Sequence, residues 1–202
     1  AARKEVIDYN EAKRKLEIYE DFLGVKEENP DFIFENAIII SRDSTDINQS
    51  FTLSKGSTDG IEVNDPVIYG KNLVGIVASV APASCTVKTI ANPDVNVAVY
   101  ETYSAEVGYI TGTGSSPDRV YSKLPGIKKE SAISPNGILC TSGSGGIYPK
   151  DLIVGTIIGI EDSKDGISLT ASVRSAVNIS ELSEVFIIKE FDGQGVVTAT
   201  QD

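Results

Sequence analysis

The hydrophobic positions at the start of the chain repeat with helical spacing. They lie three and four residues apart, with charged residues of both signs between them. The seam positions are Tyr9, Ala12, Leu16, Tyr19 and Leu23. This heptad pattern predicts an amphipathic helix over residues 1–23, with Gly24 as a helix-stop signal, and residues 1–28 are expected to form the N-terminal helical segment. Its apolar seam either packs on the rest of the chain or pairs with the same helix of a second copy in a coiled coil.

From residue 36 onward the pattern changes to short apolar, β-branched runs that are broken by Gly, Pro and Asn. The runs are residues 37–40, 51–53, 66–69, 73–80, 86–90, 95–100, 107–110, 137–140, 152–158, 167–173 and 184–188. Short strands separated by turn signals are typical of an all-β barrel or sandwich.

A weak internal repeat divides this β region. Val74-Gly75 and Val154-Gly155 each follow a loop and lead into an Ile- and Val-rich run. We therefore expect a mainly β fold, in which the N-terminal helix is followed by two small β-barrel or sandwich domains. Their expected bounds are residues 35–104 and 105–183, with residues 101–108 crossing between them. The strand at 184–190 can complete either domain, and residues 191–202 form a tail with little to anchor it.

Composition and charge narrow the classes of function. The chain has 202 residues, enough for two small domains, and a formal net charge of −11, which argues against binding to nucleic acid. It has no His, the commonest general base and metal ligand. Cys85 and Cys140 each lie in an apolar run and are expected to be buried thiols. No run is long enough to span a membrane, and the absence of Met indicates a piece of a longer protein, from which a targeting or membrane segment could have been removed.

Ser142 and Ser144 are the candidate nucleophiles. They lie in the sequence TSGSGG, and two β modules with such a string are similar to chymotrypsin-like proteases. A serine needs a base to accept its proton, and the chain offers no His, with Lys150 the nearest Lys. We therefore predict a protein that is not an enzyme, with a serine-hydrolase-like double β-barrel as the alternative.

The glycine motifs predict turns rather than ligand sites. Gly56 and Gly60, with Asp59 before the second, fit a tight turn that needs positive φ, and the spacing of a calcium loop is missing. No metal, cofactor or small-molecule substrate is expected. A cell-surface carbohydrate-binding module is a further alternative, although the chain has no Trp for stacking on sugars.

One stretch in this acidic chain has no charge. The twelve residues from Gly137 to Tyr148 contain no Asp, Glu, Lys or Arg. We expect either a flexible loop over the core or an interface with a second copy or a membrane-anchored partner. The candidate interface residues are Ser144, Ile147 and Tyr148.

Several motifs together resemble one family. LSKGSTDG at 53–60 and LVGIV at 73–77 are similar to the first β domain of MreC, the rod shape-determining protein family. TSG at 141–143, GIYPK at 146–150 and LIVG at 152–155 are similar to its second domain.

The resemblance implies a function and a location. Members are single-pass membrane proteins with a coiled coil and two extracytoplasmic β domains, and this chain would be the extracytoplasmic part. They are non-enzymatic, self-associating scaffolds of the cell-elongation (peptidoglycan synthesis) machinery. Their implied partners are MreD, MreB, RodA and a class B penicillin-binding protein.

Overall fold

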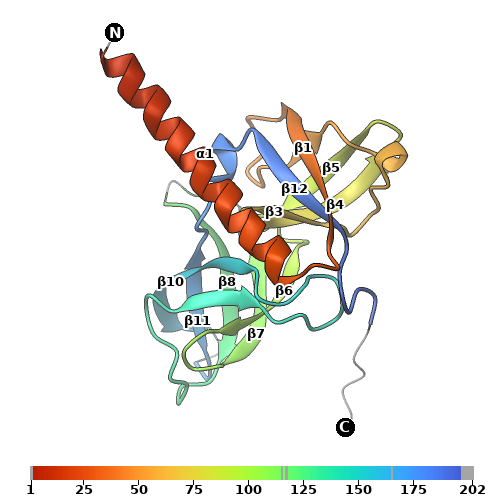
Figure 1. Cartoon of the computed structure of the whole chain (residues 1–202). Coiled ribbons are helices and arrows are strands. Elements are labelled where there is room, and N and C mark those ends of the chain that lie inside the picture. The colour runs from red at the N-terminus through yellow and green to blue at the C-terminus, as the bar shows by residue number, and fades with distance from the viewer. Residues whose placement is uncertain (1, 115, 117, 165, 197–202) are drawn as a thin grey trace.

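A computed structural model describes residues 2–114, 116, 118–164 and 166–196, with only the backbone of residues 2–5 and 7. The chain begins with helix α1 (Ala2–Glu28), whose first half projects beyond the β part (Figure 1). The helix continues through Gly24, so the predicted stop there is wrong. The turn after it is fixed by Asn29, whose backbone N and side-chain Nδ2 both donate to the carbonyl of Val25. Within the described residues no helix has the length and hydropathy of a membrane span.

Six strands form a first closed ring. They are β1 (Ile33–Arg42), β2 (Phe51–Leu53), β3 (Pro66–Tyr69), β4 (Asn72–Ala81), β5 (Ser84–Thr89) and β12 (Glu184–Glu190). Their order is β4-β3-β12-β1-β2-β5, and β5 pairs back onto β4. All pairings in this first ring are antiparallel. The last strand of the described chain thus completes the ring that the first strand begins.

The other six strands form a second closed ring. They are β6 (Asn96–Glu101), β7 (Val107–Gly112), β8 (Val120–Ile127), β9 (Ile138–Thr141), β10 (Ile153–Asp162) and β11 (Leu169–Arg174). Their order is β11-β8-β7-β6-β9-β10, and β10 pairs back onto β11. The mainly β prediction is confirmed, and closure makes each ring a barrel rather than a sandwich because neither leaves a free edge strand.

Alternation of side chains explains why these runs close. In β5, Cys85 and Val87 are buried while Thr86 and Lys88 between them are half-buried on the outer face. In β10, Val154 is buried in the same way and Ile153 faces outward. The buried side chains of the two rings belong to one hydrophobic cluster, which includes Leu53 of the first ring and Val173 of the second.

The two rings touch at several points. Strands β4 and β10 pair in parallel at Asn72 and Ile153. The loop between β1 and β2 places Ile47 against Gly114 of the second ring. The segment after β12 returns to the second ring, where the Gly195 N–H donates to the Gly146 carbonyl at 2.9 Å.

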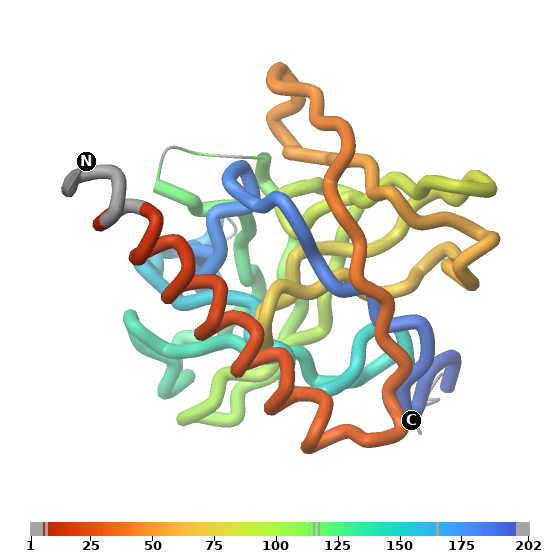
Figure 2. Tube along the Cα trace, turned by 45° about the horizontal axis from the view of Figure 1, so that its top comes forward, coloured from red at the N-terminus to blue at the C-terminus, as the bar shows by residue number. Residues whose placement is uncertain are grey.

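The segment after β12 also packs beside the turn that follows α1, as the trace in Figure 2 shows. Phe191 is buried there against Phe32, with ring centroids 6.0 Å apart. Residues 191–196 are therefore anchored, contrary to expectation, while residues 197–202 of the predicted tail lie outside the described residues.

Two expectations about the strands are wrong. Strand β8 is missing from the predicted strands, because the Pro125-Gly126 pair inside it is a turn signal in the sequence. In the structure Gly126 adopts φ +74° within the strand.

The expected domain boundary at residues 104/105 is also wrong. Strand β6 pairs with β7 and β9 of the second ring, so the chain crosses between rings before residue 96, and residues 101–106 form a hairpin turn. Whether the rings behave as two domains stays a prediction.

Candidate functional site

The C-terminal half of α1 is held on the first ring by aromatic packing. Phe22 is buried and stacks on Phe186 of β12, with centroids 3.7 Å apart and planes 5° apart. Phe34 of β1 meets the edge of Phe22 at 4.9 Å, and Tyr19 meets the edge of Phe186 at 5.9 Å. Burying large aromatic rings in this way stabilises the docked helix and sets its direction.

Polar contacts fix both flanks of the docked segment. Lys15 Nζ lies 3.0 Å from Glu184 Oε1, and the Tyr19 hydroxyl donates to Glu184 Oε2 at 3.3 Å. Burial, followed by the Glu184 charge, raises the pKa of Tyr19. On the other flank Lys71 lies 3.4 Å from Asp21. Both lysines are exposed, so these ion pairs orient the helix more than they stabilise it.

The predicted helix seam is largely solvent-exposed. Tyr9, Leu16 and Leu23 lie seven residues apart with exposed fractions of 68%, 59% and 51%. Ala12 is exposed as well, whereas Tyr19 is half-buried and contacts the β part. The helix thus docks through Phe22, which the heptad reading missed, although the apolar pair Ile18 and Phe22 one turn apart was a usable signal.

The residues Gly56 and Gly60 hold a turn for two different reasons. The turn is a 3-10 segment, η1 (Ser57–Asp59), and Gly60 ends it with φ +78°, as expected. Gly56 has φ −144°, so the expected positive φ is wrong there. A Cβ at Gly56 would instead lie 2.2 Å from the Ala81 carbonyl oxygen, so only glycine allows this close approach. Asp59 Oδ2 accepts the Gly56 N–H at 3.1 Å and closes the turn.

The uncharged stretch 137–148 contains β9 and the loop after it. Ser144 is exposed and Ile147 is 44% exposed, so both are available to a partner. Tyr148 is buried, and its ring cannot serve as a surface contact, which removes it from the predicted interface. Ser142 Oγ accepts the Ser144 N–H at 3.3 Å. The Lys150 amine, the nearest Lys in sequence, lies 5.8 Å over the ring of Tyr100.

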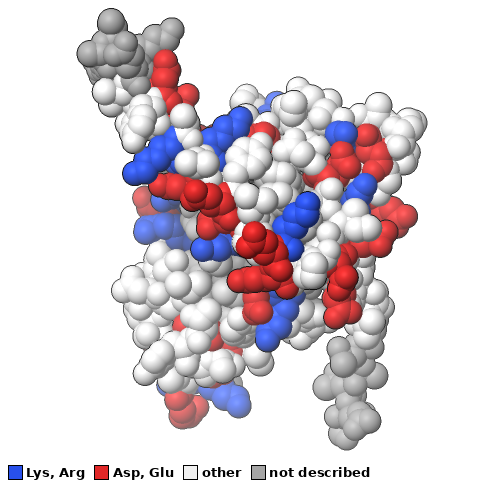
Figure 3. Space-filling model, viewed as in Figure 1, with Lys and Arg blue, Asp and Glu red and all other residues white. Residues whose placement is uncertain are grey.

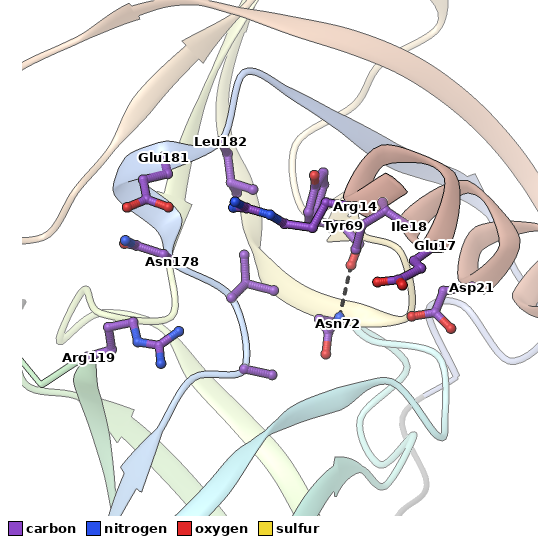
Figure 4. A pocket seen from close by; sticks show the side chains of 12 residues that line it. Arg14, Glu17, Ile18, Asp21, Tyr69, Asn72, Arg119, Asn178, Glu181 and Leu182 are labelled. Atoms are coloured by element: carbon purple, nitrogen blue, oxygen red, sulfur yellow. Dashed lines mark hydrogen bonds between the residues drawn. The ribbon is translucent and has the colours of Figure 1, made fainter. Parts of the chain in front are cut away.

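A cavity of about 340 Å³ lies between α1 and the junction of the rings (Figure 4). Arg14 reaches into it from the helix, Arg119 from the loop before β8, and Asn178 and Glu181 from the opposite side, around the 3-10 segment η2 (Ile179–Glu181). Neither arginine forms an ion pair within the described part of the chain. The sequence reasoning did not find this cavity, because its lining comes from segments more than 100 residues apart.

Both cysteines are free and buried, as predicted. Burial raises the pKa of the Cys85 thiol to about 11, and it raises the pKa of Cys140 too. Such thiols are poorly reactive. In the part of the chain that the structure describes, no three His, Cys, Asp or Glu side chains group as metal ligands would.

Comparisons with known proteins agree with this architecture. The family model described as rod shape-determining protein MreC, barrel core, matches residues 39–189. The cell shape-determining protein MreC of Listeria monocytogenes is 27% identical over 186 residues, covering 92% of this chain. The chain spans 62% of the length of that relative.

Solved structures show the same fold. A structure of MreC from Listeria monocytogenes superposes with a TM-score of 0.71 at 22% identity, covering 100% of this chain and 98% of the other. MreC in a complex with the penicillin-binding protein PBP2 from Helicobacter pylori superposes with a TM-score of 0.59 at 16% identity, covering 79% and 99%. The family model spans most of the chain, including nearly all of both rings, and the chain belongs to the MreC family of cell shape-determining proteins.

Proposed function

We propose that this chain is a non-enzymatic scaffold of the bacterial cell-elongation machinery that self-associates through α1 and displays its two rings to other proteins. The observation that supports this most directly is the exposed seam on a docked helix. Phe22 fixes the helix on the first ring, yet Tyr9, Leu16 and Leu23 remain in water. Three large apolar side chains in one stripe are the pattern of a coiled-coil partner surface.

The seam favours pairing over inward packing. Tyr19 is the seam position that contacts the β part through Glu184 and Phe186, whereas Tyr9, Leu16 and Leu23 are each more than half exposed. An inward-packed seam would instead bury Leu16 and Leu23. The homodimer, or a higher assembly, is therefore the arrangement that covers the stripe.

A class B penicillin-binding protein is the best supported further partner. The fold neighbour from Helicobacter pylori is described as a complex of PBP2 with MreC, which is a statement about that protein. We extend it to this chain and place the contact at the exposed loop residues Ser144 and Ile147. By family resemblance, MreD, MreB and RodA belong to the same assembly.

The location follows from the same resemblance. We propose that the two rings lie on the extracytoplasmic side of the cell membrane and that the whole protein is single-pass. On this view the two rings are two domains, the first completed by β12.

Sedimentation equilibrium tests the self-association. Burying one Leu is worth roughly 1.5–3 kcal/mol, so Leu16→Asp should remove most of the affinity of a short coiled coil. Asn10→Asp is the matched control, because it adds the same charge at an exposed position outside the seam. A wild-type chain that stays monomeric, or an unchanged association constant for Leu16→Asp, would refute pairing through the seam.

A fluorophosphonate probe tests the non-enzymatic part of the proposal. Without a base beside the hydroxyl, neither Ser142 nor Ser144 should react. Stoichiometric labelling at either serine would support the serine-hydrolase alternative instead.

A further inference from the structure

The cavity beside α1 is lined by arginines that have no partner among the described residues. Of the arginine side chains that the structure describes, Arg42 and Arg174 each donate to a backbone carbonyl, at 2.6 Å and 3.0 Å. Arg14 and Arg119 have neither a hydrogen bond nor an ion pair there, and both line this cavity. A guanidinium group only donates, in a geometry that matches a carboxylate, so two unpaired ones beside one cavity are suited to bind an acidic group.

The two arginines lie at the end of the cavity that is away from the helix. Figure 4 shows the Arg14 side chain reaching across toward Asn178 and Glu181, with Arg119 on the same side. Asn178 Oδ1 accepts the Ser180 hydroxyl at 2.8 Å, and its Nδ2 has no acceptor in the described part of the chain. Two arginines and one glutamate leave one positive charge unbalanced at this end.

The helix side of the cavity carries the opposite charge. Glu17 and Asp21 lie one turn apart on α1, and both line the cavity (Figure 4). Asp21 is paired with Lys71 at 3.4 Å, whereas Glu17 has no ion pair or hydrogen bond within the described residues. One negative charge is therefore unbalanced at this end.

The opposite charges beside the cavity do not neutralise each other. Figure 3 shows charged side chains of both signs gathered where α1 meets the rings. Arg14 and Glu17 are three residues apart on the helix, a spacing at which an ion pair commonly forms, yet they form none here. Each side chain is directed to a different end of the cavity and leaves its charge available to a ligand.

Apolar side chains complete the lining. They are Ile18, Val177 and Leu182, of which the last two are buried. The cavity has a volume of about 340 Å³, and pockets for small ligands range from roughly 300 to 1,000 Å³. A partly apolar wall with a few polar groups at separate ends is typical of a site that fixes the orientation of a small molecule.

We propose that this cavity binds a zwitterion, namely an amino acid or a short peptide with free ends. Its carboxylate lies against Arg14, Arg119 and Asn178, and its ammonium group lies against Glu17. A simple anion would leave Glu17 unpaired and a simple cation would leave the arginines unpaired, whereas a molecule with both charges satisfies both ends. The inference does not depend on the proposed self-association.

The site would join three segments of the chain. Arg14 belongs to α1, Arg119 to the loop before β8 of the second ring, and Asn178 to the segment that returns from β11 to β12. Phe22 already packs α1 on Phe186 of the first ring. A bound zwitterion would add a bridge from the helix to the second ring and so hold the helix relative to both rings.

Nuclear magnetic resonance of the isotope-labelled chain, titrated with dialanine, tests the site. Saturable shifts are expected at the backbone amides of Arg119 and Asn178. Arg14→Gln and Arg119→Gln should each weaken binding about tenfold or more, because each removes a charged donor, and neither should lower the melting temperature. Lys13→Gln is the matched control, since it removes the same charge from an exposed position of α1 outside the cavity lining.

Modified peptides test whether both charges are read. Dialanine amide lacks the carboxylate and N-acetyl-dialanine lacks the ammonium group, so each should bind about tenfold or more weakly than dialanine. Glu17→Gln should weaken the binding of dialanine but strengthen that of N-acetyl-dialanine, because it removes a negative charge that only the ammonium group uses. Alanine and trialanine identify the preferred length, since the tightest of the three ligands shows whether the site takes a free amino acid or a peptide.

Three results would overturn the inference. The first is the absence of saturable shifts at Arg119 and Asn178 with alanine, dialanine and trialanine alike. The second is equal affinity for dialanine and N-acetyl-dialanine, which would make the cavity a site for simple anions. The third is a loss of binding in Lys13→Gln as large as in Arg14→Gln, which would assign the effect to net charge.

Discussion

Phe22 of α1 and Phe186 of β12 stack face to face, with ring centroids 3.7 Å apart and planes 5° apart. The two residues are far apart in the sequence, and their contact decides which face of the helix is hidden. The seam is exposed because Phe22, rather than Leu16 or Leu23, fills the position over β12.

Phe22→Ala is expected to release the helix. Loss of a buried Phe side chain costs about 3–5 kcal/mol in a rigid core, and most of that loss should appear as undocking of α1 rather than unfolding of the rings. Hydrogen exchange of the amides of residues 16–28 should accelerate strongly. Leu23→Ala, next to it but exposed, should change the exchange little. Equal protection in the two variants would show that Phe22 does not hold the helix.

Gly56 and Gly60 should differ in their tolerance of alanine. Gly60→Ala meets only the strain of a positive φ, about 1 kcal/mol or slightly more. Gly56→Ala places a methyl group 2.2 Å from the Ala81 oxygen, so the backbone must move and the loss of stability should be larger. Urea unfolding of both variants measures the difference. The reverse order of stability would contradict the close approach at Gly56.

Asp65 should make stability fall as the pH rises. Burial raises the pKa of this carboxyl to about 6, whereas it is near 3.8 in the unfolded chain. Between these values the folded chain binds the proton more tightly, so the contribution to stability is full below about pH 4 and lost as the pH passes 6. From this pKa difference we expect the free energy of unfolding to be lower by roughly 2–3 kcal/mol at pH 7 than below pH 4.

Asp65→Asn tests this dependence, because its amide oxygen can still accept the Glu62 N–H that Asp65 Oδ2 accepts at 2.8 Å. The variant should be more stable than the wild type at pH 7 and should lose that advantage near pH 4. Parallel stability curves from pH 4 to 7 would mean that Asp65 titrates normally in the folded chain.

Gly146→Ala should loosen the segment that follows β12. A Cβ there would lie 2.7 Å from the Gly193 carbonyl oxygen and from the Val196 nitrogen. Gly145→Ala is the matched control, since Gly145 also has positive φ but no atom within 4 Å of its Cβ position. Proteolysis at residues 192–196 should be faster in Gly146→Ala. If both variants are cut at the same rate, the contact with Gly146 does not anchor this segment.

Ile147→Lys is expected to weaken binding of a class B penicillin-binding protein while leaving the melting temperature unchanged. Ile147 is half-exposed, so a Lys side chain can reach water without disturbing the core. Surface plasmon resonance with the purified partner measures the effect, and Lys150→Ala serves as an exposed control nearby. Wild-type affinity for Ile147→Lys would move the partner contact to another surface.

Sequence patterns determined the elements whose signal is local. The heptad spacing identified α1, and alternating apolar runs identified every strand except β8, because both periods are set by backbone geometry alone. Burial of Cys85 and Cys140 followed from their apolar neighbours in the same way. The uncharged character of residues 137–148 could likewise be read directly from the chain.

Only the tertiary structure decided how these elements are shared between the rings. The apolar run of β12 fits either ring equally well, and its pairing with β1 and β3 depends on contacts across more than 100 residues. For the same reason the sequence could not show that Tyr148 is buried, or that Gly56 avoids the Ala81 carbonyl. Each of these depends on which distant backbone lies beside the residue, and neither local periodicity nor composition contains that information.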